Sequence, residues 1–382
     1  MLKDFIDFNP RETLPKGQPA KKVAMEKLRP FCRDIEEFEV AKYGGGTKFR
    51  NGDTLLARIT PCLENGKTAQ VRFLNDGEVG FGSTEYIVLR AKEGVSDSDY
   101  IYYLSTSPKF REIAIQSMVG SSGRQRVQQD VLEKAELHIP PLDEQRKIAG
   151  ILSALDDKIE LNNKINRNLE AQAQAIFKSW FIDFEPFGGS MPNRWKIGNL
   201  LDIATYLNGL SMQKYKPRKG ISFLPVLKIR ELRQGFCDKD SDICSTEIGN
   251  EFIIDDGDIV FSWSGTLLIN IWCAGKCGLN QHLFKVFSKK YDKWFYYLWT
   301  KHYLPKFIHI ASGKATTMGH IKREDLEKAK VLIPSKEEYL YLSRIMSPII
   351  NRMIQNRLES VNIVKLRDML LPKLMSGEIL IS

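Results

Sequence analysis

The sequence predicts a mixed α+β fold in which two similar globular domains are separated by two long antiparallel coiled-coil helices. Three observations support this prediction. A proline-free stretch from Asp143 to Phe184 has the apolar spacing of a long helix. The same spacing returns 194 residues further along the chain. The segments that precede the two helices share short motifs at matching places. We therefore expect an internal repeat with pseudo-two-fold symmetry.

Both helical stretches carry an a/d seam, in which apolar residues recur at alternating steps of four and three. The first seam consists of Ile148, Leu152, Leu155, Ile159, Asn162, Leu169 and Ile176. The second seam consists of Leu342, Met346, Ile349, Met353, Asn356, Ile363 and Leu370. A helix of about 35 residues is roughly 50 Å long, so the pair can act as a spacer. In the alternative interpretation, each amphipathic helix packs only against its own domain.

Two asparagines occupy matching places on the seams, Asn162 and Asn356. Facing asparagines can satisfy each other's hydrogen bonds and fix the register of a helix pair, so we expect these two side chains to face each other. Pro348 and Pro372 lie inside the second stretch and are expected to bend or break it. Gly377 is a natural C-terminal cap for that helix.

Domain boundaries follow from the two helices and from a linker rich in proline and glycine that begins at residue 185. We place the first globular domain at residues 1–142, the central spacer helix at 143–184, the second globular domain at 185–336 and the C-terminal spacer helix at 337–382.

Apolar runs between glycine turns predict three strands in the first domain, at 53–59, 69–73 and 86–89. A helix is expected to start at Asp99. The tripeptide Tyr-Tyr-Leu at 102–104 returns at 296–298, which keeps the offset of 194. With the same offset His138 corresponds to Leu332, so we expect His138 to be a packed strand residue.

The composition is that of a soluble protein, with 43% hydrophobic and 27% charged residues. No run approaches the ~18 apolar residues of a membrane span, and the acidic start differs from a signal peptide. We expect a cytoplasmic protein without membrane contact. Residues 186–336 hold 23 Lys and Arg against 14 Asp and Glu, whereas residues 1–145 hold 21 against 22. A basic domain is typical of proteins that bind a polyanion.

Signals for catalysis and for metal binding are weak. The tetrapeptide Asn65-Gly66-Lys67-Thr68 resembles the end of a P-loop, but Pro61 replaces the glycine that a phosphate cradle needs. The histidines show no metal-ligand spacing. The cysteines lack the two-residue knuckle of a zinc site, so free thiols are expected at Cys237, Cys244, Cys273 and Cys277. We interpret the chain as non-catalytic, with no metal and no cofactor of its own.

Basic and polar side chains in loops are the candidates for contact with double-stranded DNA. Small residues let a backbone approach phosphate, and Arg, Gln and His side chains can contact base edges. The candidates in the first domain are Lys48, Arg50, Arg58, Ser122, Arg124, Gln125 and Arg126. Those in the second domain are Lys214, Lys216, Arg218, Lys219, Arg230, Ser262, Trp263, Ser264, Asn280, Gln281, His282, Lys314, Thr316, Thr317 and His320. A merely solvated surface is the alternative for the basic run that starts at Lys214.

Several further stretches are specific when taken together. They are Asn51–Leu55, Pro61–Lys67, Ile139–Gln145, Lys178–Phe187, Pro192–Trp195, Phe261–Thr266, Leu279–His282 and Leu371–Ile379. In these stretches, which are spread over nearly the whole chain, the protein resembles the specificity subunit of type I restriction-modification systems. The resemblance implies two target recognition domains, each of which contacts one half of a split DNA site.

The resemblance also implies partners. Two antiparallel helices set the gap and dock two methylation (M) subunits, and restriction (R) subunits join the assembly. S-adenosylmethionine, ATP and magnesium belong to those partners. The chain departs from the pattern in two places, because the first domain lacks a lead-in like Met191–Leu201 and the second helix lacks the Gln of Asp143-Glu144-Gln145. The alternatives are a stand-alone DNA-binding adaptor, a lone nuclease or methyltransferase, and a coiled-coil scaffold without a DNA role.

Overall fold

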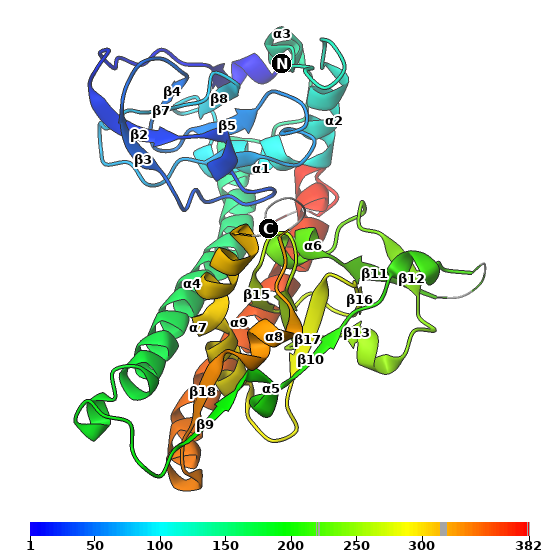
Figure 1. Ribbon diagram of the computed structural model, residues 1–382. Helices are drawn as coiled ribbons and strands as arrows, with labels where there is room; N and C mark the ends of the chain where they lie inside the picture. The colour runs from blue at the N-terminus through cyan, green and yellow to red at the C-terminus, as the bar shows by residue number, and fades with distance from the viewer. Residues whose placement is uncertain (219, 221, 314–318, 380, 382) are drawn as a thin grey trace. The chain divides into compact units, whose positions relative to one another are not determined.

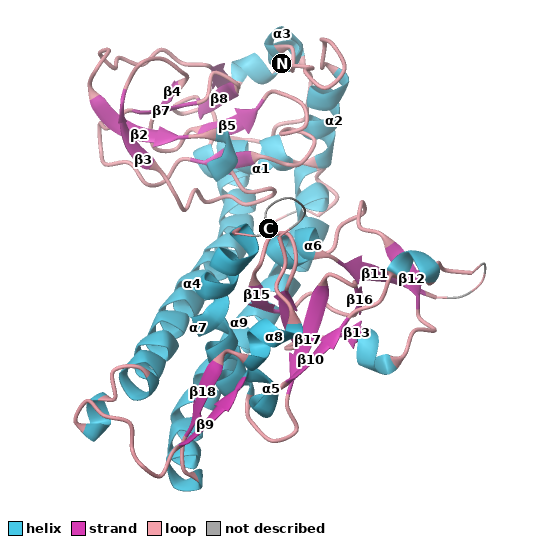
Figure 2. Cartoon of the chain, in the orientation of Figure 1, coloured by secondary structure: helices cyan, strands magenta, loops and turns pink. Residues whose placement is uncertain are grey.

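The chain divides into two compact units. The computed structural model describes residues 1–218, 220, 222–313, 319–379 and 381. The first unit comprises Met1–Glu160 and Ile363–Ser382, and the second comprises Leu161–Asn362. Each unit has its own sheets, and the long helices α4 and α9 each contribute one section to each unit (Figures 1 and 2).

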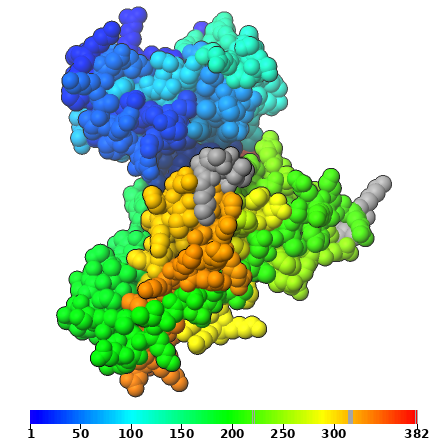
Figure 3. All heavy atoms as spheres, in the orientation of Figure 1, coloured from blue at the N-terminus to red at the C-terminus, as the bar shows by residue number. Residues whose placement is uncertain are grey.

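The first unit contains two four-stranded sheets with the orders β1-β8-β5-β6 and β3-β2-β7-β4. Its strands are β1 (Ile6–Phe8), β2 (Pro19–Val23), β3 (Glu39–Lys42), β4 (Lys48–Phe49), β5 (Thr54–Ala57), β6 (Thr68–Gln70), β7 (Gly80–Gly82) and β8 (Tyr86–Ala91). Its shorter helices are α1 (Ser98–Thr106), α2 (Pro108–Gln116) and α3 (Gln129–Lys134), with 3-10 turns η1 (Leu2–Asp4) and η2 (Met25–Lys27). The blue and cyan atoms of this unit pack together as one body in the space-filling view (Figure 3).

The second unit contains two four-stranded sheets with the orders β10-β17-β14-β15 and β12-β11-β16-β13. Its strands are β9 (Lys196–Asn199), β10 (Thr205–Asn208), β11 (Phe223–Leu227), β12 (Ile243–Ser245), β13 (Ile253–Ile254), β14 (Ile259–Ser262), β15 (Ile269–Ile271), β16 (Cys277–Leu279), β17 (Leu283–Phe287) and β18 (Lys330–Ile333). Its shorter helices are α5 (Leu200–Ile203), α6 (Ile229–Gln234), α7 (Lys293–Ser312) and α8 (Arg323–Glu327), with 3-10 turns η3 (Glu185–Phe187), η4 (Met212–Lys214) and η5 (Asn250–Phe252).

The two units share one topology. The first eight strands of the first unit correspond, in chain order, to β10–β17 of the second, and both sheet orders match under that correspondence. The parallel pair β2–β7 likewise corresponds to the parallel pair β11–β16. The prediction of two similar mixed α/β domains is therefore confirmed.

One strand pair of the second unit differs from the first. Strand β18 pairs antiparallel with β9, and no described strand of the first unit pairs in the corresponding way. The segment that corresponds to β18 in the first unit forms no strand, and His138 is exposed there. The expectation of a packed strand position for His138 is wrong, because a strand needs a neighbour to satisfy its backbone.

The central strand of each unit separates two cores. In β5 every residue is buried, with Leu55 in the core between the sheets and Leu56 in the core beneath α1 and α2. A glycine turn precedes this strand in both units, where Gly52 has φ +86° and Gly257 has φ +82°, a conformation that glycine adopts without strain. The alternation of buried faces on a doubly covered strand follows from its period of two.

The long helices are α4 (Leu142–Phe181) and α9 (Lys336–Met375). Neither Pro348 nor Pro372 ends α9, so the expected break is absent, and Gly377 with φ +74° follows its last turn as predicted. None of the predicted seam residues is exposed. The buried face is wider than an a/d seam because the helices also contact the globular parts, as the burial of Phe177 and Phe181 in the core of the second unit demonstrates. No described helix is both long and apolar enough to cross a membrane.

The buried asparagines of the second unit bond across the helix pair in a register that the sequence did not predict. The side-chain amide of Asn356 donates to Asn166 Oδ1 at 2.9 Å. The amide of Asn162 donates to the backbone carbonyl of Asn356 at 3.3 Å and to Ser360 Oγ at 3.2 Å. The expected contact between Asn162 and Asn356 is therefore present, but the amide-to-amide bond joins Asn356 to the asparagine one turn further along α4.

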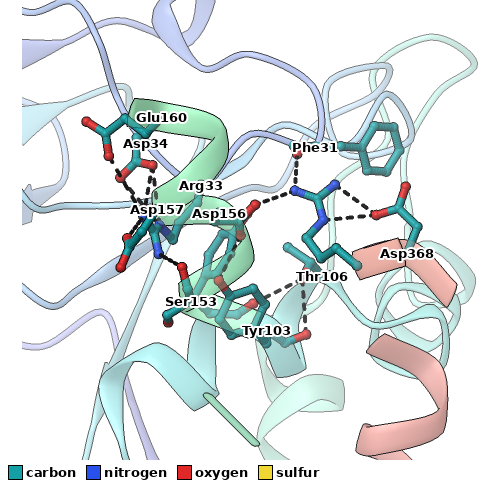
Figure 4. A network of polar contacts seen from close by, with 12 residues as sticks. Phe31, Arg33, Asp34, Tyr103, Thr106, Ser153, Asp156, Asp157, Glu160 and Asp368 are labelled. Carbon is teal, nitrogen blue, oxygen red and sulfur yellow. Dashed lines mark hydrogen bonds and ion pairs between the residues drawn. The ribbon is translucent and has the colours of Figure 1, made fainter. Parts of the chain in front are cut away.

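A buried carboxylate, Asp156, joins three elements of the first unit (Figure 4). Tyr103 of α1 donates its hydroxyl to Asp156 Oδ2 at 2.7 Å. Arg367 of α9 donates to Asp156 Oδ1 at 2.7 Å and lies 3.5 Å from the carbonyl oxygen of Phe31. Burial of a charge is costly unless it is paired and hydrogen-bonded, and here both carboxylate oxygens have donors.

A second buried cation, Arg33, attaches the loop before β3 to α4. Its guanidinium donates to Asp157 Oδ1 at 2.5 Å and to the carbonyl oxygen of Ser153 at 3.4 Å, and it also bonds Asp34 (Figure 4). The side chain of Arg33 is fully enclosed. The two arginines together fix the position of the sheets of the first unit on its section of the helix pair.

The second unit has apolar residues at the places of the Asp156–Arg367 ion pair. With the offset of 194, Ile350 corresponds to Asp156 and Ala173 to Arg367. Both are buried in the core of the second unit. The repeat therefore uses a buried ion pair in one unit and apolar packing in the other.

The start of each long helix is tied to the N-cap of a shorter helix. In the first unit Gln145, which is buried, accepts a bond from the backbone of Asp97 at 3.0 Å. In the second unit the hydroxyl of Tyr339 accepts the equivalent bond from Asp292 at 2.6 Å. The missing Gln of the second helix is thus replaced by a tyrosine that makes the same backbone contact.

We expect Arg367→Ala to destabilise the first unit by about 3–5 kcal/mol, because it leaves the Asp156 carboxylate buried without its cation. Urea unfolding of the full chain, combined with hydrogen exchange along α4, measures the loss and places it in that unit. The double variant Asp156→Ile with Arg367→Ala copies the apolar pair of the second unit and is expected to recover most of the stability.

Arg146→Ala on the same helix is the matched control. This residue is exposed and, among the described residues, forms an ion pair with the exposed Asp143, so its loss should change stability by no more than about 0.5 kcal/mol. A cost for Arg367→Ala as small as that of the control contradicts the structural role of the buried pair.

Glu338, in the first turn of α9, is expected to make the stability of the chain depend on pH. Burial favours its neutral form, but hydrogen bonds from Arg194, Ser335 and Trp195 outweigh burial and lower its pKa from 4.5 to about 2. A depressed pKa contributes stability that is complete above pH ~4.5 and is lost as the pH falls toward 2. The contribution is on the order of 3 kcal/mol. Glu338→Gln should flatten the pH dependence of the urea midpoint in that window, whereas Glu337→Gln, an exposed neighbour, should leave it unchanged.

Candidate nucleic-acid interface

Three segments meet at one corner of the first unit. Arg58 follows the last residue of β5, Glu85 precedes the first residue of β8, and Arg126 lies on the hairpin after α2. The backbone N–H of Arg58 donates to the carbonyl of Glu85 at 2.9 Å, and the N–H of Val127 donates to the carbonyl of Arg58 at 2.9 Å. We call Arg58, Glu85 and Arg126 the first corner.

The second unit has the same arrangement with other side chains. Trp263 follows β14, His282 precedes β17, and His320 lies in the segment that corresponds to the hairpin. The N–H of Trp263 donates to the carbonyl of His282 at 3.4 Å, and the N–H of Ile321 donates to the carbonyl of Trp263 at 3.1 Å. We call Trp263, His282 and His320 the second corner.

A third backbone bond completes both corners. In the first unit Thr60 N donates to Gln125 O at 3.0 Å, and in the second unit Gly265 N donates to Gly319 O at 2.9 Å. Gln125 and Gly319, which correspond in the repeat, thus accept equivalent backbone bonds. Because hydrogen bonds fix the backbone of both corners in the same way, the chemical difference between them lies in the side chains.

The first corner is charged. The guanidinium of Arg126 donates Nε to Glu85 Oε1 at 3.0 Å and Nη2 to the same oxygen at 2.6 Å. These bonds lower the pKa of Glu85, so it is a carboxylate at neutral pH. Arg58 Nε lies 3.9 Å from Glu85 Oε2 and, within the described part of the chain, has no hydrogen-bond acceptor although it is buried. Three charged groups of net charge +1 therefore meet at a partly exposed place.

The second corner is aromatic. The indole of Trp263 lies 6.2 Å from the rings of both His282 and His320, and its Nε1 donates to Asn208 Oδ1 at 3.0 Å. Ser264 Oγ bonds His282 Nδ1 at 2.8 Å. A hollow of about 610 Å³ adjoins Trp263 and His320 and is also lined by basic residues of the α8 start. Aromatic faces of this kind are suited to stacking and to contact with apolar base edges.

Two of the predicted residues support the second corner from inside. Ser262 is fully buried and its hydroxyl donates to the carbonyl of Ser264, and Ser264 is itself buried. A ligand cannot reach Ser262 in this arrangement, so its assignment to direct DNA contact is corrected. Asn280 accepts a bond from the backbone of His282 at 3.2 Å, and Gln281 is exposed beside it.

The remaining candidates of the first unit differ in availability. Ser122 and Arg124 are exposed at the tip of the hairpin, and Gln125 is half-buried. Lys48 donates to the carbonyl of Glu12 at 2.5 Å, and Arg50 is exposed. The hairpin tip therefore offers the most accessible polar groups next to the first corner.

The basic run of the second unit is mostly exposed. Lys214, Lys216 and Arg218 all lie at the surface. Arg230 differs, because it bonds Glu231 at 2.8 Å and Asp238 at 2.9 Å, which neutralises its charge locally. Four predicted residues lie outside the described residues: Lys219, Lys314, Thr316 and Thr317.

Sequence reasoning missed Glu85 and Asn208. Glu85 directly precedes the predicted strand at 86–89, and His282 directly precedes β17 in the other unit, so an alignment of the strands rather than of the helices would have found Glu85. In the part of the chain that the structure describes, no group of three or more His, Cys, Asp or Glu residues is placed to bind a metal. The six cysteines are free thiols.

These observations define a class of protein with two similar α/β units and two shared long helices. Each unit has a corner with the same backbone hydrogen bonds and its own set of side chains. A family model described as the type I restriction modification DNA specificity domain matches the chain twice, at residues 2–171 and 192–362. The chain belongs to this family.

Relatives and a solved structure agree with this membership. The chain is 30% identical to the type I restriction enzyme MjaIX specificity subunit of Methanocaldococcus jannaschii, over 75% of this chain and 70% of the relative. It is 24% identical to the HindI specificity subunit of Haemophilus influenzae, over 86% of this chain and 87% of the relative. The crystal structure of a type I restriction-modification system S subunit from M. genitalium has the same fold, with a TM-score of 0.54, 15% identity, and coverage of 98% and 94% of the two chains.

Proposed function

We propose that this chain is the DNA specificity subunit of a type I restriction-modification complex and that each unit recognises one half of a bipartite DNA site. The observation that carries the proposal is the pair of corners. Two half-sites of different sequence require two recognition surfaces with the same backbone and different side chains. The two corners meet this requirement, because the positions of Arg58, Glu85 and Arg126 in the first unit are occupied in the second by Trp263, His282 and His320.

Contact with the phosphates is assigned to exposed cations outside the corners. Lys214, Lys216 and Arg218 in the second unit and Arg124 in the first are all exposed. Phosphate contacts position a protein on DNA, whereas contacts with base edges provide the sequence preference. The exposed cations therefore supply affinity, and the corners supply specificity.

The helices are proposed to set the gap between the half-sites and to dock two methylation subunits, which restriction subunits then join. Large apolar side chains are exposed along both helices, and in this proposal the methylation subunits cover them. These side chains are Ile151, Leu161, Leu340, Tyr341, Ile345, Leu366 and Met369. In this proposal the catalytic activities belong to the partners, and this chain binds no cofactor.

The test uses Arg126→Ala and Trp263→Ala in complexes of the full chain with its methylation subunit. Each variant is expected to weaken or relax one half-site only, by about 1–3 kcal/mol, because each removes a side chain from one corner. Selection from a pool of randomised duplexes measures both half-sites in one experiment.

Two results distinguish the alternatives. If neither variant changes the preference at any base, the corners are not the recognition surfaces. If the pure chain without partners cleaves or methylates DNA in the presence of magnesium and a methyl donor, the chain is an enzyme and the proposal of a non-catalytic subunit is wrong.

A further inference from the structure

The geometry of the first corner identifies the base that it contacts. A guanidinium group carries five N–H donors in a planar fork. Glu85 occupies the edge of the Arg126 guanidinium that consists of Nε and Nη2. The other edge, formed by Nη1 and the second N–H of Nη2, makes no hydrogen bond to any residue that the structure describes. Arg126 is 42% exposed, so this edge is accessible.

A carboxylate at this place argues against a phosphate ligand. Glu85 stays ionised because of its bonds to Arg126, so its charge repels a phosphate group and offsets part of the attraction of the two arginines. A base edge carries no net charge, so the carboxylate does not repel it in this way. Guanine offers two adjacent acceptors in the major groove, O6 and N7, whose spacing matches two parallel N–H groups of arginine.

Arg58 adds a second observation at the same place. Its buried Nε has no acceptor among the described residues, and neither has the buried hydroxyl of Thr60, two residues further along. Buried polar groups are normally satisfied, so this pair leaves hydrogen-bonding capacity beside the exposed guanidinium that the described residues do not fill. The carboxylate of Glu85 bonds Arg126 and lies 3.9 Å from Arg58 Nε, so both guanidinium groups adjoin it.

We propose that Arg126 contacts a guanine in the half-site of the first unit through its free edge, and that Glu85 is a positioning residue that fixes this edge. The inference rests on the proposed function and names the base for one corner. The second corner has neither a guanidinium nor a carboxylate at the equivalent positions, since Trp263, His282 and His320 stand there. The second half-site therefore lacks this guanine contact.

The experiment compares wild type with Arg126→Lys in the complex of the full chain and its methylation subunit. Lysine keeps the charge but is a point donor without the fork. The randomised-duplex selection is expected to show a guanine at one position of the first half-site for wild type and a ten- to hundred-fold loss of that preference for Arg126→Lys. The second half-site should be unchanged for both proteins.

Two further measurements separate base contact from a structural effect. Duplexes with 7-deazaguanine at that position lack the N7 acceptor, so they should bind wild type more weakly and bind Arg126→Lys no differently from guanine. Glu85→Gln retains an oxygen acceptor but loses the charge, and it should lower the guanine preference without lowering affinity for the second half-site. Arg29→Lys is the matched control, because Arg29 is an exposed arginine that pairs with Glu36 outside the corner, and it should keep the guanine preference.

The outcomes are decisive in both directions. An undiminished guanine preference in Arg126→Lys, or equal binding of guanine and 7-deazaguanine by wild type, overturns the inference while the specificity function stands. A wild-type complex that selects no bipartite sequence at all refutes the proposed function itself, which is a different result. Loss of preference at both half-sites in Arg126→Lys indicates a folding defect in that variant. In that case Glu85→Gln and the 7-deazaguanine duplex decide whether the first corner contacts a guanine.

Discussion

The first unit depends on one buried carboxylate. Asp156 on α4 receives a hydroxyl from α1 and a guanidinium from α9, and that guanidinium also approaches the backbone at Phe31. None of these groups can be buried alone without a cost of several kcal/mol. The helix, the sheet domain and the end of the chain must therefore assemble together, and the position of β5 and of the first corner follows from that assembly.

In the proposed function, the two corners use the same backbone arrangement to recognise two different DNA sequences. Main-chain hydrogen bonds between the strand ends and residues 125–127 or 319–321 hold each corner, so the side chains at the three positions can differ between the units. A rigid scaffold with variable side chains is a general arrangement for recognition, because side-chain changes alter specificity without altering the fold. Side chains inside the scaffold, such as Ser262 and Ser264, are constrained by packing.

The sequence predicted the parts of this fold that depend on the periodic spacing of apolar residues. The two helices, the repeat and the strands at 54–57 and 86–91 follow from spacing and turn residues. The partner of Asn356 was missed by one turn, because the register of an antiparallel pair is a property of two helices and not of either sequence. Asp156 and Arg367 were missed because a pattern of apolar residues gives no weight to charges that pair only in three dimensions. Glu85 was missed because the repeat was aligned on the helices and not on the strands.

The first unit includes both ends of the chain, since Ile363–Ser382 completes it. Because residues from both ends of the chain belong to this unit, the position of a crossover decides whether a recombinant keeps the unit intact. Crossovers within α4 after Glu160 and within α9 before Ile363 replace the second unit as a whole and leave Asp156 with Arg367. A single crossover at the linker near residue 186 brings in a foreign last helix, which must supply its own cation at position 367. Recombination between members of the family therefore preserves the first unit when the crossovers lie at the two helix positions. A crossover at the linker preserves that unit only when the incoming helix supplies the cation.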